Sequence, residues 1–145
     1  MITEIKGDLF TTGAQVILHG CNCQGKMGSG VAKAVREKYP VVFDEYEELH
    51  RTRGLKLGSI LPVKVGKDKW VVNCMTQKFY GYDGKQYVSY DAVWECLHRV
   101  ASMASKEYKI AMPKIGCGLA GGDWEVVRKI VEDELKDFEV LVYSL

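Results

Sequence analysis

The sequence predicts one α/β domain in which helices cover both faces of a largely parallel or mixed sheet. Short runs rich in Val, Ile and Leu alternate along the chain with longer segments whose apolar residues recur at helical spacing. Two glycine-rich stretches, 20–30 and 116–122, each follow such an apolar run and precede a helical segment. In sheets of this kind ligands bind at the carboxyl ends of the strands, so both stretches can converge on one cleft.

The N-terminal half is predicted to contain strands and helices in the following order. We expect strands at 2–6 and 15–19, helices at 30–39 and 41–51, and strands at 59–65 and 69–75. Pro40 separates the two helices because proline disfavours helical geometry at the residue before it. The segment 66–68 is expected to connect a hairpin or two neighbouring strands.

The C-terminal half begins with the segment 76–87, which is rich in Tyr, Phe and Gly. This segment either covers a ligand or is a disordered surface loop. The remaining elements are expected to be a helix from the N-cap Ser89 to about 105, a strand at 109–113, a helix at 124–135 and a strand at 138–143.

Length and composition limit the function classes. A chain of 145 residues fits a single domain, 1–145, and a net charge of +1 gives no global field that would attract DNA or a membrane. The five cysteines form an odd, irregularly spaced set, and no signal peptide or long apolar run is visible. We expect a cytoplasmic, monomeric protein without disulfides, membrane association or a cofactor. No metal site is expected, because Cys21 and Cys23 lack a second pair with zinc-ligand spacing.

The first glycine-rich stretch has the character of a phosphate cradle. Glycines let the backbone approach a ligand closely, and the free N–H groups of the helix that begins after Gly30 favour an anion. Residues 20–26 formally match a P-loop, but Met27 stands where Ser or Thr would hold Mg²⁺. An ATPase or GTPase is therefore disfavoured. A glycine-rich turn that only connects strand and helix would be shorter.

The second glycine-rich stretch formally matches the dinucleotide-binding pattern G-x-G-x-x-G at 116–121. Its position near the C-terminus, without an acidic residue to bind a ribose, argues against a dehydrogenase. Two loops of N–H donors suit a diphosphate, and Tyr143 could stack on a base. The expected ligand is a nucleotide diphosphate sugar bound without Mg²⁺.

Five motifs, in this order along the chain, resemble those of macrodomains. They lie at 6–10, 19–23, 27–32, 112–119 and 142–145. Within that superfamily the chain is similar to the small branch of yeast-type ADP-ribose-1″-phosphate phosphatases and of hydrolases that remove ADP-ribose from glutamate or DNA. The resemblance implies a three-layer α/β/α fold around a mixed six- or seven-stranded sheet, with ADP-ribose across the strand ends.

The resemblance also implies that each of these motifs contacts a different part of ADP-ribose. Asp8 would bind the adenine amine and Leu9 the neighbouring edge, although Asp8 could instead cap a turn. Residues Asn22 and 28–31 would surround the distal ribose, and 115–119 would hold the diphosphate. The full set of ligand contacts implied is Asp8, Leu9, Asn22, Met27, Gly28, Ser29, Gly30, Val31, Thr76, Ile115, Gly116, Cys117, Gly118, Leu119, Tyr143 and Ser144.

The catalytic residues are less clearly indicated. In the glutamate-ADP-ribose hydrolases a lysine and an aspartate stand where this chain has Gln77 and Ala120. Asp123 or His19 could activate water, and Asn22 could position the ribose or phosphate. Asp123 could equally be a helix N-cap, and His19 a hydrogen-bonded histidine at a strand end.

Three functions follow from this resemblance. The first is a metal-independent ADP-ribose-1″-phosphate phosphatase. The alternatives are a hydrolase that removes ADP-ribose from protein or nucleic acid, and a non-catalytic ADP-ribose reader, which the missing Lys and Asp would favour.

Overall fold

A computed structural model describes residues 1–145 as a six-stranded mixed sheet between two layers of helices. The elements in chain order are β1 (Ile2–Lys6), the 3₁₀ helix η1 (Leu9–Thr11), β2 (Val16–Asn22), α1 (Gly30–Lys38), α2 (Pro40–Thr52), β3 (Ile60–Gly66), β4 (Lys69–Gln77), α3 (Tyr90–Met103), β5 (Ile110–Pro113), α4 (Trp124–Glu134) and β6 (Val140–Ser144). The sheet order is β1-β6-β5-β2-β4-β3. The predicted α/β/α class is confirmed, with six strands.

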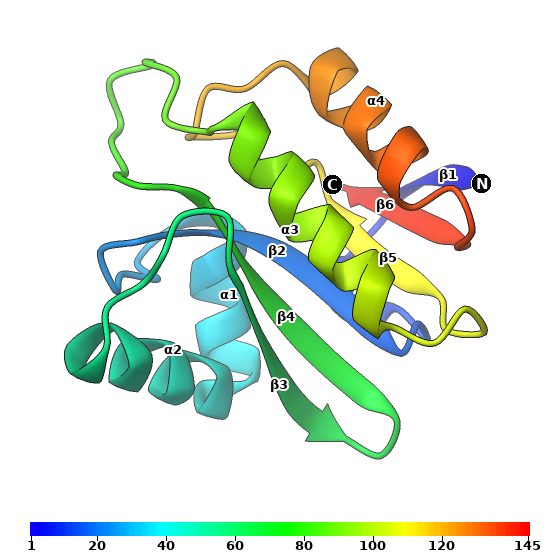
Figure 1. Cartoon of the computed structure of the whole chain (residues 1–145), viewed down its shortest axis with the longest axis horizontal. Coiled ribbons are helices and arrows are strands. Elements are labelled where there is room, and N and C mark those ends of the chain that lie inside the picture. Colours follow the sequence, from blue (N-terminus) through cyan, green and yellow to red (C-terminus); the bar gives the residue numbers. More distant parts are fainter.

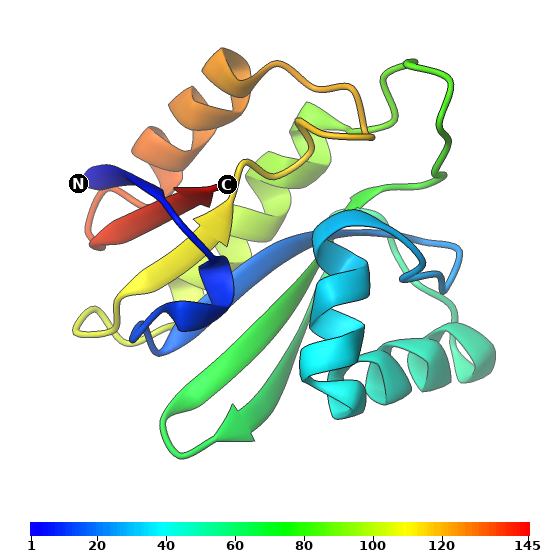
Figure 2. The same cartoon turned by 180° about the vertical axis from the view of Figure 1, so that it is seen from behind.

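All neighbouring strands are parallel except β3 and β4, which form the predicted hairpin at one edge of the sheet. Helices α3 and α4 cover the face seen in Figure 1, and α1 and α2 cover the opposite face, seen in Figure 2. Each helical layer encloses its own apolar cluster against the sheet. The buried side chains of the strands therefore point alternately into two cores.

The helix boundaries follow the local sequence signals. Ser89 caps α3 by accepting a hydrogen bond from Ala92 N at 3.1 Å, and Asp123 caps α4 by accepting one from Glu125 N at 2.9 Å. Pro40 is the first residue of α2, where its missing N–H costs nothing. The predicted break between α1 and α2 is thus confirmed. No helix is long and apolar enough to cross a membrane.

Two strands end later than predicted. Strand β2 continues through Asn22 and β4 through Gln77, because these residues pair with each other across a β-bulge after Cys21. Bulges bend a strand and re-aim its side chains. Thr76, expected to begin a loop, is therefore a buried strand residue.

Candidate functional site

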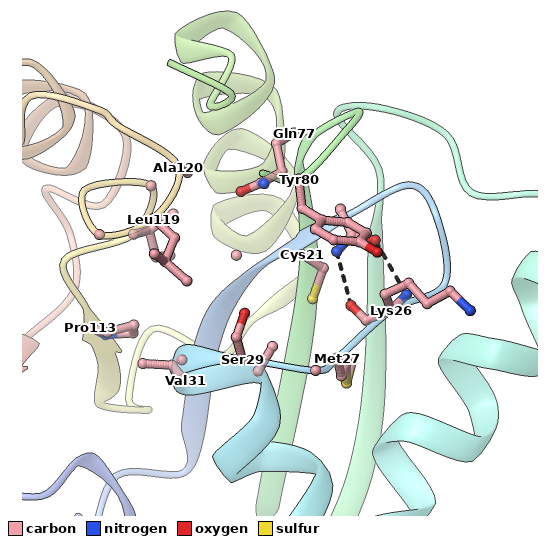
Figure 3. A pocket seen from close by; sticks show the side chains of 18 of the residues that line it. Cys21, Lys26, Met27, Ser29, Val31, Gln77, Tyr80, Pro113, Leu119 and Ala120 are labelled. Atoms are coloured by element: carbon pink, nitrogen blue, oxygen red, sulfur yellow. Dashed lines mark hydrogen bonds between the residues drawn. The ribbon is translucent and has the colours of Figure 1, made fainter. Parts of the chain in front are cut away.

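A cleft lies at the carboxyl ends of β2, β5 and β6, between the two glycine-rich loops. It has a volume of about 740 Å³. Figure 3 shows Ser29 and Val31 on one side of it and Leu119 and Ala120 on the other. The predicted ligand residues that line it are Asn22, Met27, Gly28, Ser29, Gly30, Val31, Ile115, Gly116, Cys117, Gly118, Leu119, Tyr143 and Ser144. The structure therefore brings together most of the predicted binding set.

The first glycine-rich loop is organised by Asn22. Its Oδ1 accepts hydrogen bonds from Gln24 N at 2.9 Å and Lys26 N at 3.3 Å, and its Nδ2 donates to Lys26 O at 2.9 Å. The buried Tyr46 on α2 supports it, with its hydroxyl 2.6 Å from Asn22 O and 2.9 Å from Asn22 Oδ1. Asn22 thus uses its side chain mainly to shape the loop that surrounds the cleft.

The backbone supplies the hydrogen-bond donors of the cleft. The N–H groups of Gly30 and Val31 begin α1, and the N–H groups of Gly116, Gly118 and Leu119 belong to the second loop; none of them has an acceptor within the protein. Exposed N–H groups at a helix start and in a turn favour an anion. Two such groups of donors facing one cleft suit a diphosphate.

The second loop depends on glycine at particular positions. Gly116 has φ +75° and Gly121 has φ +73°, a region that side chains rarely adopt. A Cβ at Gly122 would lie 2.5 Å from Gly116 O, to which Gly122 N donates at 2.7 Å. The loop therefore closes on itself at 116–122, and within it the N–H groups of Gly118 and Leu119 keep no acceptor in the protein.

The aromatic segment 78–87 lies along the cleft. Tyr80 N donates to Gln24 Oε1 at 3.1 Å, and the Tyr82 hydroxyl donates to Ser29 Oγ at 3.2 Å. Tyr80, Gly81 and Tyr82 line the cleft, as does Gln77. Residues 80–82 thus lie at the cleft, and the interpretation that the segment covers a ligand stays a prediction.

Asp8 and Leu9 do not line the cleft. Leu9 is buried, and Asp8 Oδ1 caps η1 by accepting from Phe10 N at 2.9 Å. Asp8 nevertheless follows the strand β1 that pairs with Tyr143 and Ser144 of β6. Its side chain is exposed, so Oδ2 can still accept a hydrogen bond there. The contact of Asp8 with an adenine amine stays a prediction.

His19 lies beneath the cleft and not in it. Its side chain is fully buried, and its Nε2 donates to Asn73 Oδ1 at 2.5 Å. Burial lowers the pKa of His19 to about 4, so the ring is neutral near pH 7. His19 does not line the cleft, so its placement gives no support to the predicted role in activating water. His19 is the last residue of the predicted strand 15–19, and its polar side chain gave no sign in the sequence that it would be buried.

Thr76 and Asp123 are also placed away from the cleft. Thr76 is buried, and its Oγ1, which has no hydrogen-bond partner, would lie 2.8 Å from a Cβ added at Gly20, a residue that lines the cleft. The Asp123 carboxylate caps α4 and does not line the cleft. The predicted ligand contact of Thr76 and the predicted catalytic role of Asp123 stay predictions, and the capping interpretation of Asp123 is confirmed.

The thiols of the cleft are not activated. Burial raises the pKa of Cys117 to about 11, and burial also raises the pKa of Cys21. Protonated thiols are poor nucleophiles. No group of three His, Cys, Asp or Glu side chains is arranged to hold a metal ion.

Several residues of the cleft escaped the sequence analysis. They are Lys26, Arg36, Phe43, Glu47, Gln77, Pro113 and Lys114. Arg36 and Glu47 are charged residues of α1 and α2, where helical periodicity predicts only surface positions. Phe43 of α2 is partly buried against the apolar cluster under these helices. Their place in the cleft depends on how the two helices pack.

Known proteins resemble this chain over its whole length. The Macro domain family model matches residues 18–131. An ADP-ribose 1″-phosphate phosphatase from Candida albicans is 30% identical, and the alignment covers 100% of this chain and 98% of that protein. A DNA ADP-ribosyl glycohydrolase from Mycobacterium tuberculosis is 31% identical over 99% of this chain, which spans 42% of that longer protein. A solved structure of a Bacteroides thetaiotaomicron protein of unknown function is 34% identical, with a TM-score of 0.88 and coverage of 100% of this chain and 98% of that one.

Tyr46→Phe tests how the first loop is held. We expect a loss of about 1–3 kcal/mol in the free energy of unfolding, because the two partly buried Asn22 oxygens lose the hydroxyl donor of the buried Tyr46. Urea denaturation measures this loss, and hydrogen exchange of amides 24–28 should accelerate. Tyr108→Phe is the control, because the Tyr108 hydroxyl makes no hydrogen bond within the protein. Equal exchange rates in Tyr46→Phe and the parent would refute the supporting role.

The pH dependence of unfolding tests the buried His19. Because its pKa is lower in the folded state, the unfolded chain gains a proton first as the pH falls below about 6.5. His19 should therefore reduce stability progressively from pH 6.5 to pH 4, by roughly 3 kcal/mol in total. Urea titrations across this range should show that the parent loses more stability than His19→Gln. His50→Gln, which changes an exposed histidine, should keep the pH dependence of the parent; a parent and His19→Gln with the same slope would contradict the burial argument.

Proposed function

The chain belongs to the Macro domain family, and from this premise we propose that it is an ADP-ribose-1″-phosphate phosphatase that needs no metal ion. The observation that carries the proposal is the cleft itself, in which two sets of unpaired N–H groups face one space. Full-length similarity to the Candida albicans phosphatase supports the same substrate. The reaction would add water across the bond between phosphorus and the O1″ oxygen, giving ADP-ribose and inorganic phosphate.

The ligand would lie along the cleft with its adenine near Tyr143 and Ser144. The N–H groups at 30–31 and 116–119 would hold the diphosphate, and residues 22 and 28–31 would surround the distal ribose. Asp8 would accept a hydrogen bond from the adenine amine with its free Oδ2. In this arrangement the contacts with the diphosphate come from backbone N–H groups, whose charge does not change with pH.

Phosphate-ester hydrolysis suits a cleft with this chemistry. This reaction is accelerated mainly by positioning of the reacting groups and by stabilisation of negative charge in the transition state, and less by a strong base. The charged side chains that line the cleft are Lys26, Arg36, Lys114 and Glu47, and Glu47 is paired with Arg51 at 3.6 Å. The protein would therefore contribute donors and positive charge and leave the attacking water to be oriented by the bound substrate.

The second candidate is removal of ADP-ribose from protein or nucleic acid. The Mycobacterium tuberculosis relative supports it, since it is named a DNA ADP-ribosyl glycohydrolase. Against it, Gln77 and Ala120 occupy the positions of the lysine and aspartate of the glutamate-ADP-ribose hydrolases, and Lys78, the next lysine along the chain, does not line the cleft. A reader without turnover is the third candidate, and one assay separates all three.

The assay offers three substrates to the protein: ADP-ribose-1″-phosphate, ADP-ribosylated protein and ADP-ribosylated DNA. We expect release of inorganic phosphate from the first, at a rate that EDTA leaves unchanged. Asp123→Asn should keep most of this activity, because asparagine caps a helix about as well as aspartate. A 10²–10⁴-fold loss in Asp123→Asn would instead identify a general base. Turnover of an ADP-ribosylated macromolecule alone would support the second candidate, and binding without turnover the third.

A further inference from the structure

We propose that Lys26 and Arg36 form a subsite for the phosphate on the distal ribose, and that this subsite makes the cleft select ADP-ribose-1″-phosphate over ADP-ribose. The inference deepens the proposed function and rests on it for the identity of the ligand. It concerns a part of the cleft to which the sequence motifs assign no contact.

Two of the four charged side chains that line the cleft have ion-pair partners, and two have none. Lys114 Nζ lies 3.9 Å from Glu4 Oε1, and Glu47 Oε1 lies 3.6 Å from Arg51 Nε. Both of these lining residues thus have an ion-pair partner outside the cleft, and Lys114 shares Glu4 with Arg128. Lys26 and Arg36 line the same cleft and form no ion pair. Their two positive charges remain available to a ligand.

The Arg36 side chain is already positioned. Its guanidinium carbon lies 3.9 Å from the centroid of the Phe43 ring, so the group stacks on α2. Stacking restrains the side chain, and no hydrogen bond within the protein occupies its N–H groups. A restrained guanidinium with free donors matches the planar, two-pronged recognition of a phosphate.

Lys26 is anchored through its backbone. Its backbone N and O are both held by the Asn22 side chain, at 3.3 Å and 2.9 Å. Figure 3 shows the Lys26 side chain leaving the loop on the side of α2, away from Ser29. The ammonium group is exposed, so it can move toward a bound anion from a fixed base.

The orientation of the ligand in the cleft would place its distal phosphate near Lys26 and Arg36. The sheet order β6-β5-β2 places Tyr143 and Ser144 of β6 on one side of the cleft and the loop after β2, which carries Lys26, on the other. Arg36 of α1 and Phe43 of α2 also line the cleft. A ligand whose base lies near Tyr143 therefore has its distal ribose on the side of Lys26. A phosphate monoester carries a charge of about −1.5 to −2 at pH 7, which ADP-ribose lacks at this position.

The test compares two ligands on matched variants. Lys26→Met and Arg36→Met remove the charge and keep an apolar stem, and Lys38→Met makes the same change of charge on α1 outside the cleft. Calorimetry gives the Kd of ADP-ribose for each variant. If the parent hydrolyses ADP-ribose-1″-phosphate, single-turnover rates at increasing protein concentration give the protein concentration at half-saturation for this ligand. If the parent does not hydrolyse it, calorimetry gives the Kd of ADP-ribose-1″-phosphate directly. Either route yields the ratio of the affinity for ADP-ribose-1″-phosphate to the affinity for ADP-ribose. Turnover tests the proposed phosphatase activity and this ratio tests the subsite, so the two can fail independently.

We expect the parent to bind ADP-ribose-1″-phosphate at least about 10-fold more tightly than ADP-ribose, with a ratio that falls as salt is added. Lys26→Met and Arg36→Met should each lower this ratio about 5-fold or more, with the Kd of ADP-ribose within about 2-fold of the parent. Lys38→Met should keep the parent ratio. An unchanged ratio in both cleft variants, or a parent ratio near one, would overturn the proposal. The last ligand tested is a short single-stranded oligonucleotide. If Arg36→Met weakens its binding while the parent binds ADP-ribose-1″-phosphate and ADP-ribose equally, Lys26 and Arg36 bind a polynucleotide and the proposal is also wrong.

Discussion

The parallel pairing of β2 with β5 is the constraint on which the cleft depends. Val16 pairs with Ile110 and Ile17 with Ala111, so both strands run in the same direction and both glycine-rich loops leave the same edge of the sheet. A strand of seven residues such as β2 is roughly 20 Å long. If either strand ran the other way, the two sets of N–H donors would lie at opposite ends of the sheet, and neither could complete the other's site.

The residues that fix the shape of the cleft differ from the groups that are exposed in it. Asn22 and Tyr46 shape the first loop, the buried pair His19 and Asn73 lies under the strand end, and Asp123 fixes the start of α4. None of these is arranged as an acid or base toward the cleft. The groups that face it are backbone N–H donors and a small number of cations, which is the chemistry of anion recognition. The function proposed here follows from that division.

Much of the fold could be predicted from the sequence because its signals are local. The caps Ser89 and Asp123, the break at Pro40 and the β3–β4 hairpin all depend on neighbouring residues. The glycine-rich loops could be recognised for the same reason. The bulge after Cys21 could not be predicted, because it arises from pairing with a strand more than fifty residues away. That pairing extends β2 and sets the position from which Asn22 organises the first loop. Arg36 and Phe43 were missed because only the packing of α1 against α2 makes them part of the cleft.

The central claim is that both glycine-rich loops bind one diphosphate. The most direct measurement is a titration of the ¹⁵N-labelled protein with ADP-ribose, followed through the backbone amide resonances. Amides of 28–31 and 115–119 should shift together and saturate with a single Kd, since one ligand would contact both loops. Shifts confined to one loop, or two loops that saturate at different ligand concentrations, would contradict the account.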